Sequence, residues 1–142
     1  MKGERAMSKG SSGLFSGTSG AGKALIDEVI SNGDKISPDE VLLIGRDQAG
    51  KIVWLEEGNS SSGLKHIIDE HGNDFSNIGI SEEDIPEFVM EAVSQGEIVD
   101  YQGKRNPRPI YEFEYNGETY RVAVQVGNNG YIVGANPRSS KE

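Results

Sequence analysis

The chain has 142 residues, 35% of them hydrophobic, and a formal net charge of −9. This length gives room for one domain with an ordinary hydrophobic core. The absence of cysteine excludes disulfides and thiolate metal sites, and no apolar run reaches the roughly 18 residues that a membrane span needs.

The charge is unevenly distributed along the chain. Residues 36–95 carry 3 basic and 13 acidic side chains, a net charge of −10, whereas residues 96–142 carry 6 of each sign. An acidic protein is a poor non-specific binder of nucleic acid. A local basic cleft remains possible in the C-terminal third.

The N-terminal stretch 1–20 is rich in glycine and serine and has no hydrophobic period. We expect it to be a flexible linker or tail, followed by a single domain at 21–142. Residues 17–23 match the opening of a phosphate-binding P-loop, but Ala24 stands where Ser or Thr would bind magnesium. No buried strand is expected before this loop, so we interpret it as a lead into a short helix at 23–31. The predicted apolar side of that helix comprises Leu25, Val29 and Ile30.

Hydrophobic periodicity and turn residues predict the remaining elements. In chain order these are strands at 41–44 and 51–55, helices at 64–71 and 82–95, and strands at 97–101, 108–115, 118–126 and 131–134. The pair Asn116-Gly117 is the strongest short-range signal for a β-hairpin. Together the elements predict an α+β fold, with helices packed on an antiparallel sheet of four strands or more.

The predicted helix at 64–71 holds both histidines of the chain. An apolar face follows from the helical spacing of Leu64, Ile67, Ile68 and His71. His66 falls about 140° away, on a charged face, and Gly72 is expected to end the helix. Proton transfer near neutral pH would use one of these rings, with His71 as the better buried candidate. The alternative is structural: His71 packs or stabilises the helix C-terminus, and His66 is solvated.

The turn at Asn116-Gly117 also fixes the register of its hairpin. On the apolar face the expected pairs are Tyr115 with Glu118, Phe113 with Tyr120 and Tyr111 with Val122. The opposite face pairs Glu112 with Arg121 and brings Gln125 beside Arg108. This face is either a solvated surface with one ion pair, or a polar surface that binds phosphate through arginine and moves protons through Glu or His.

Three motifs carry a resemblance to a known family. They are Gly-Leu-x-His-Ile-x-x-x-His at 63–71, Arg-Pro-Ile-Tyr-Glu at 108–112 and Val-Gly-x-Asn-Gly-Tyr-Ile-Val-Gly-Ala-Asn-Pro at 126–137. Over residues 21–139 the chain resembles the C-terminal toxin domains of bacterial polymorphic toxins in the barnase/EndoU/colicin E5-D/RelE-like (BECR) superfamily. The likeness is to the phage-barnase-EndoU-type branch, which is found at the ends of RHS, contact-dependent growth inhibition and LXG toxins.

The resemblance implies a BECR-like fold and a metal-independent ribonuclease that needs no cofactor. In such enzymes the ribose 2′-OH attacks the adjacent phosphate and leaves a 2′,3′-cyclic end, and the expected substrate here is RNA, in the first place tRNA. It also implies delivery as the C-terminal part of a larger secreted toxin during interbacterial competition. The domain would act in the target-cell cytoplasm and be neutralised by a cognate immunity protein.

The resemblance also assigns roles to individual residues. His66 and His71 match the paired histidines of the family's helix motif, and Arg108 matches its strand arginine. From the hairpin register we add Glu112 and Arg121 to these candidate catalytic residues. In this interpretation a histidine is the general base or acid, and the arginines stabilise the charge of the phosphorane.

Lys104, Arg105 and Asn136 are expected to hold the substrate, and no residue is assigned to a metal. Two other functions are compatible with the sequence: a deoxyribonuclease effector on the same scaffold, and a non-enzymatic immunity or interaction module. DNA has no internal 2′-OH nucleophile, so chemistry without a metal favours RNA. The acidic middle of the chain is the feature that favours the module.

Overall fold

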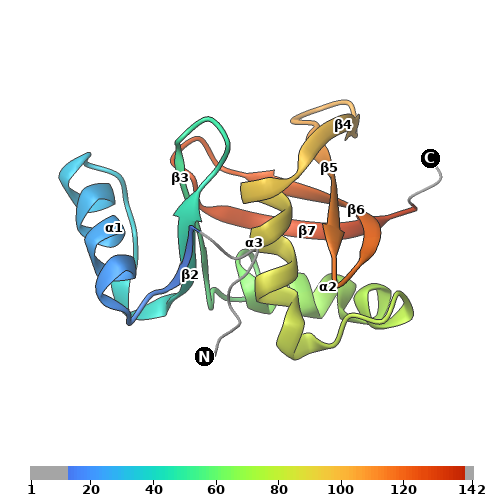
Figure 1. The fold of residues 1–142 in the computed structure, drawn as a ribbon, viewed down its shortest axis with the longest axis horizontal. Coiled ribbons are helices and arrows are strands. Elements are labelled where there is room, and N and C mark those ends of the chain that lie inside the picture. Colours follow the sequence, from blue (N-terminus) through green and yellow to red (C-terminus); the bar gives the residue numbers. More distant parts are fainter. Residues whose placement is uncertain (1–12, 140–142) are drawn as a thin grey trace.

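In the computed structural model, residues 13–139 are described, and they form two antiparallel sheets and three α-helices (Figure 1). The smaller sheet has the order β1-β2-β3, with the bounds Leu14–Ser16, Val41–Arg46 and Ile52–Glu56. The larger sheet has the order β4-β5-β6-β7, with the bounds Glu97–Gln102, Arg108–Tyr115, Glu118–Val126 and Ile132–Arg138. Helices α1, α2 and α3 span Gly20–Ser31, Leu64–Asn77 and Ile85–Gln95, and two 3₁₀ turns span Pro38–Glu40 and Glu82–Asp84. This architecture confirms the predicted α+β class.

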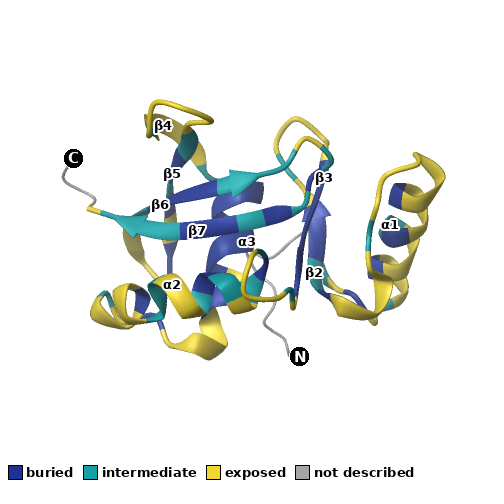
Figure 2. Cartoon of the chain, turned by 180° about the vertical axis from the view of Figure 1, so that it is seen from behind, coloured by how far each residue is buried: buried dark blue, intermediate teal, exposed yellow. Residues whose placement is uncertain are grey.

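The main hydrophobic core lies where α3 packs on one face of the larger sheet and α2 runs along its edge strand β7. Phe88 of α3 is fully buried at the centre of this core. Its ring is in edge-to-face contact, with centroids 4.9 to 5.8 Å apart, with Phe75, Phe113, Tyr115 and Tyr120. Seen from behind, β6 and β7 lie in front of α3, so the other sheet face is turned away from this helix (Figure 2).

A second, smaller core joins α1 to β2 and β3. Ile26 and Val29 of α1 are buried against this sheet together with Ile44 and Trp54. The Trp54 ring also contacts Tyr131, just before β7, at a centroid distance of 6.2 Å. This contact links the two sheets. The prediction that Ile30 belongs to the apolar side of α1 is wrong, because Ile30 is 51% exposed and Ile26 takes its place.

The hairpin of β5 and β6 has the register that the Asn116-Gly117 turn predicts. Asn116 and Gly117 both have a positive φ, of 52° and 84°, as a type I′ turn requires. Tyr115 pairs with Glu118 and Phe113 with Tyr120, and every pair predicted for the apolar face is confirmed. The tyrosines and phenylalanines of this face therefore point into the core.

Helix α2 does not end at Gly72, contrary to the prediction. It continues to Asn77, and the first glycine beyond its end with a positive φ is Gly79, at 88°. The reason is Phe75, which is fully buried and lies on the helix face that Ile67 begins. Burying this ring stabilises the extra helical turn by more than the roughly 1 kcal/mol that an internal glycine costs. Gly96, by contrast, follows the end of α3 as predicted.

The N-terminal boundary of the folded domain also differs from the prediction. Residues 14–16 form β1, which pairs with β2, so folded structure begins before residue 20. The part of the predicted linker at 1–12 lies outside the described residues. Ser19 caps α1 by accepting a hydrogen bond from the Gly22 N–H at 2.9 Å, and the helix starts at Gly20 rather than at residue 23.

A strand, β1, precedes the P-loop-like segment, but its residues are half-buried or exposed, so no buried strand precedes this loop, as predicted. Three backbone N–H groups of this loop are already used within the chain. Gly17 donates to Leu42 O, Ser19 to Ser16 O, and Thr18 to the Ser16 hydroxyl. A phosphate cradle needs such N–H groups free, so the segment serves to connect β1 to α1.

Strand β7 is longer than predicted, because it runs to Arg138 rather than to residue 134. Asn136 and Pro137 thus belong to the sheet, where they pair with Ala123 and Val122 of β6. Among the residues described, no helix combines the length and apolar character that crossing a membrane requires.

We expect Tyr115 to make the fold sensitive to alkaline pH. Burial, followed by the negative charge of Glu87, raises the pKa of Tyr115 well above its ordinary value, and its hydroxyl donates to Glu87 Oε1 at 3.0 Å. Unfolded tyrosine titrates near pH 10, so above that pH the unfolded state binds fewer protons than the folded state. The free energy of unfolding then falls as pH rises, by at most about 1.4 kcal/mol per pH unit for this group.

The test is urea unfolding at pH 8 and pH 11. Tyr115→Phe should lose less stability between these pH values than the wild type does, because phenylalanine has no proton to release. Tyr101→Phe is the matched control, since Tyr101 is 57% exposed. Equal losses in Tyr115→Phe and wild type would contradict the prediction.

Candidate functional site

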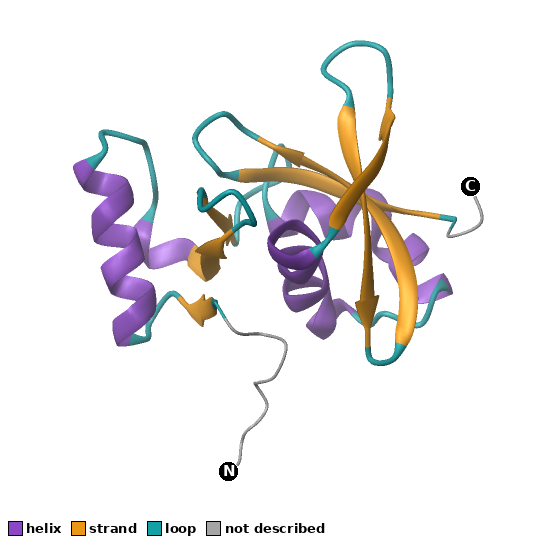
Figure 3. Cartoon of the chain, turned by 45° about the horizontal axis from the view of Figure 1, so that its top comes forward, coloured by secondary structure: helices purple, strands orange, loops and turns teal. Residues whose placement is uncertain are grey.

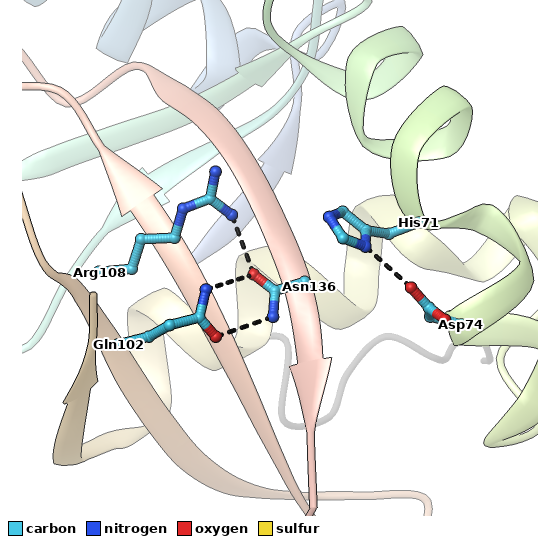
Figure 4. A network of polar contacts seen from close by, with 5 residues as sticks. All are labelled: His71, Asp74, Gln102, Arg108 and Asn136. Atoms are coloured by element: carbon cyan, nitrogen blue, oxygen red, sulfur yellow. Dashed lines mark hydrogen bonds and ion pairs between the residues drawn. The ribbon is translucent and has the colours of Figure 1, made fainter.

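Arg108 lies at the start of β5 and is held only by neutral groups. Its Nη1 donates to Asn136 Oδ1 at 3.0 Å (Figure 4), and its Nη2 donates to Gln125 Oε1 at 3.4 Å. Within residues 13–139 no carboxylate forms an ion pair with it. Partial burial lowers the pKa of Arg108 from its usual value, but the group stays cationic at neutral pH. A partly buried cation without a counter-charge is suited to bind an anion.

The side-chain amides of Gln102 and Asn136 bond to each other, and these bonds orient the Asn136 oxygen that accepts from Arg108. Gln102 Nε2 donates to Asn136 Oδ1 at 3.1 Å, and Asn136 Nδ2 donates back to Gln102 Oε1 at 3.0 Å. Arg138 Nη1 donates to the same Gln102 oxygen at 2.8 Å. Asn136 Oδ1 is thereby turned toward Arg108. The structure thus places Asn136, predicted to hold substrate, as a partner of Arg108.

His66 presents its unprotonated nitrogen away from the backbone. Its Nδ1 lies 2.9 Å from the carbonyl oxygen of Ser60. Because a carbonyl can only accept, Nδ1 carries the proton, and the neutral ring has its lone pair on Nε2. This is the arrangement that a general base requires.

His66 and Arg108 meet over Gly134 of β7. A Cβ atom built on Gly134 would lie 3.6 Å from Cδ2 of the His66 ring and 3.1 Å from Nη2 of Arg108. Cδ2 is bonded to Nε2, so the basic nitrogen is one bond away from the ring atom that lies beside Gly134. An imidazole and a guanidinium therefore border one small space, which exists because residue 134 has no side chain.

We expect Gly134→Val to abolish most activity at this site without unfolding the protein. A valine would place its branched carbons between His66 and Arg108, where even one Cβ is tightly confined. The expected loss is about a hundredfold or more in kcat/KM. Gly134→Ala should lose less, and Gly20→Val at the start of α1, where a Cβ meets nothing within 4 Å, is the control. Circular dichroism would check the fold, and full activity in Gly134→Val would rule out the shared space as the site.

His71 is less buried than its place on the apolar face predicts. Its side chain is 33% exposed, and Nδ1 lies 2.8 Å from Asp74 Oδ2. In Figure 4 its ring extends from α2 toward β7, where Asn136 lies. Five helical residues rise about 7.5 Å and two strand residues about 6.7 Å. The distance along α2 from His66 to His71 is therefore similar to the distance along β7 from Gly134 to Asn136.

The predicted pair of Glu112 and Arg121 forms, but apart from the histidines. Arg121 Nε donates to Glu112 Oε2 at 2.9 Å, which confirms the predicted cross-strand pairing. Glu112 is four residues along β5 from Arg108, a distance of about 13 Å in a strand. The structure therefore does not bring this ion pair to the space between His66 and Arg108, and Arg121 already has a counter-charge.

Lys104 and Arg105 lie in the exposed loop between β4 and β5 (Figure 3). Neither has an ion-pair partner within the described part of the chain. The loop closes directly before Arg108, which pairs with Gln102 across it. These two cations are thus available near the end of the sheet where Arg108 lies.

Sequence reasoning missed three contributors to this site. Gln102 comes from β4, whose pairing with β5 shifts at a bulge between Ile98 and Asp100, so no turn signal fixed its register. Ser60 acts through its backbone, which leaves no trace in the residue type. Gly134 lies within the motif at 126–137, but it was not assigned a role. The signal that could have found it is a glycine inside a strand, which often marks a place where other groups approach the backbone closely.

No group of three or more His, Asp or Glu side chains is placed to hold a metal ion within residues 13–139. Comparison of the sequence with protein-family models and with curated proteins found no match. A function must therefore be assigned from the side chains around Gly134.

Proposed function

We propose that this protein is an endoribonuclease that cleaves RNA by attack of the ribose 2′-OH, without a metal ion. The observation that carries the proposal is the convergence of His66 and the counter-charge-free Arg108 over Gly134. A base near neutral pH and a cation for a phosphate are the two groups that this reaction needs. The resemblance of the three sequence motifs to BECR nuclease toxins supports the same chemistry.

The proposed reaction gives each side chain one role. His66 Nε2 takes the proton of the 2′-OH as the 2′-oxygen forms a bond to phosphorus. Arg108 donates to the non-bridging oxygens, where negative charge accumulates. His71, protonated and paired with Asp74, gives a proton to the 5′-oxygen as its bond to phosphorus breaks. The products are a 2′,3′-cyclic phosphate and a free 5′-hydroxyl.

Lys104 and Arg105 are proposed to contact phosphates outside the reacting one. They are exposed side chains on a loop next to Arg108, so they add affinity rather than chemistry. Binding that depends on such contacts weakens as salt rises, which distinguishes their contribution from that of Arg108.

The direct test incubates the purified chain with total RNA, with tRNA and with duplex DNA, each with and without EDTA. Discrete RNA fragments that persist in EDTA and carry 2′,3′-cyclic ends are the expected result. Cleavage of DNA that stops in EDTA would favour a deoxyribonuclease instead. No cleavage of either nucleic acid would favour a non-enzymatic interaction module.

The biological setting that we propose is interbacterial competition, with the domain delivered as the C-terminal part of a larger toxin and acting in the target-cell cytoplasm. A cognate immunity protein would neutralise it, and the net charge of −10 on residues 36–95 offers a basic partner a surface. Expression in the cytoplasm of a bacterium should arrest growth. The variant Arg108→Ala should not, and this difference separates toxicity by cleavage from toxicity by overexpression.

A further inference from the structure

A pocket of about 300 Å³ opens where the two sheets meet, beside the turn that positions His66. Its wall comes from four separate parts of the chain: the segment after α1, the end of β3, the turn before α2 and the turn before β7. The residues that matter below are Lys35, Glu56, Asn59, Ser62, Asn129 and Tyr131.

Glu56 gives this pocket a buried carboxylate with one open oxygen. The residue is 6% exposed. Its Oε2 accepts hydrogen bonds from Trp54 Nε1 at 2.9 Å and from the Ser37 N–H at 3.0 Å. Its Oε1 has no hydrogen-bond partner in the described part of the chain and is not sealed in the core. A buried carboxylate oxygen strongly favours an N–H or O–H donor, and the pocket is where a ligand can supply one.

Donor groups line the same pocket. Asn59 Oδ1 accepts from the N–H groups of Ser61 and Ser62, and Asn129 Oδ1 accepts from the N–H of Tyr131. The Nδ2 groups of both asparagines are without a partner among residues 13–139. Lys35 is exposed at the same pocket and forms no ion pair with Glu56. The pocket thus offers a carboxylate, two amide donors and a separate cation.

The turn at residues 59–62 connects this pocket to His66. The Ser60 carbonyl holds the His66 ring at 2.9 Å, while the Ser62 hydroxyl lies 2.7 Å from the Tyr131 hydroxyl at the pocket. Asn59 and Ser62 are joined across the turn by a β-bridge. One short segment therefore has the pocket on one side and the base of the proposed reaction on the other.

We propose that this pocket binds the base of a nucleotide that flanks the cleaved phosphate, and that it selects bases with an exocyclic amino group. This inference rests on the proposed ribonuclease function. Adenine, cytosine and guanine each offer an amino N–H to Glu56 Oε1, next to an acceptor that an asparagine Nδ2 can reach. Uracil offers only an N–H between two carbonyl oxygens, which the carboxylate repels. Lys35 binds the phosphate of the same nucleotide.

The chain provides its own reporter for the test. Trp54 is the only tryptophan, and its indole N–H donates to the pocket's carboxylate, so its single NMR cross-peak reports on Glu56. AMP, CMP and GMP should shift this peak to saturation, whereas UMP should bind about tenfold more weakly or worse. Glu56→Gln keeps an oxygen for Trp54 and Ser37 but loses the charge, and it should lower affinity for the first three by about tenfold.

Two further variants keep the test decisive. Glu57→Gln alters the exposed neighbouring carboxylate and should leave binding unchanged. Lys35→Gln should weaken binding of the nucleotides but not of the corresponding nucleosides. Equal binding of UMP, no peak shift with any nucleotide, or an unaffected Glu56→Gln would each overturn the proposal.

These measurements do not depend on cleavage, so the two proposals can fail separately. Selective nucleotide binding in a protein that does not cleave RNA would overturn the proposed ribonuclease function but not the proposed base-binding pocket. RNA cleavage that has no base preference, and is the same in Glu56→Gln, would overturn the proposed base-binding pocket but not the proposed ribonuclease function.

Discussion

Arg108→Ala should lower the rate of RNA cleavage by about a thousandfold, with little change in stability. A guanidinium that contacts the reacting phosphate contributes to the transition state on this scale. The variant removes a partly buried side chain whose partners, Asn136 and Gln125, are neutral amides. Asn136 keeps its two hydrogen bonds with Gln102 and Gln125 can bind water, so folding should be preserved. The measurement is kcat/KM on a short RNA, with thermal unfolding in parallel.

Two controls make the result specific to Arg108. Arg46→Ala removes an exposed arginine of the smaller sheet that is paired with Glu28 at 2.8 Å, and it should cleave at the wild-type rate. Arg108→Lys keeps the charge but loses the planar fork of donors, so it should fall between wild type and alanine. Arg108→Ala protein that is folded and fully active would exclude this residue from the reaction.

His66→Ala should lower kcat/KM by about a hundredfold to ten-thousandfold, the range that a general base contributes. The physical reason is the fixed tautomer: with Nδ1 donating to the Ser60 carbonyl at 2.9 Å, Nε2 is the basic atom of the ring, and it is bonded to the Cδ2 that lies beside Gly134. The acidic limb of the pH–rate profile should disappear in this variant, because that limb reports protonation of the base.

His71→Ala separates the two histidines by chemistry. A general acid is needed only when the leaving group is a poor one, so a phosphodiester of RNA with an aryl leaving group should restore the rate of His71→Ala and not that of His66→Ala. If the aryl substrate restores His66→Ala instead, the two roles are exchanged. If neither variant loses activity on RNA, general acid–base catalysis by α2 is excluded.

The larger sheet was predictable because its signals are local. Asn116-Gly117 requires a two-residue turn, and the turn dictates which residues of β5 and β6 face each other. That reasoning correctly gave the pairing of Glu112 with Arg121 and the approach of Gln125 to Arg108. Alternation along a strand then decided which side chains enter the core.

The site itself was only partly predictable, since it depends on distant contacts. Spacing on a helical wheel favoured His71 over His66, because the wheel shows the helix alone and not the strand beside it. Only the packing of α2 along β7 brings His66 to Gly134. Likewise, Gly72 is an ordinary helix terminator by residue type, and burial of Phe75 in tertiary structure overrides it.

Because β7 contributes to the site, it determines when during translation the proposed site can form. Ser60, His66 and Arg108 all emerge from the ribosome before Gly134 and Asn136, and a chain that still lacks the last strand cannot align the base with the guanidinium. Domains gain structure in the order in which they are translated. In the proposed ribonuclease, a nascent chain would thus be unable to cleave RNA while it is attached to the ribosome, and activity would begin only when the last strand joins the sheet.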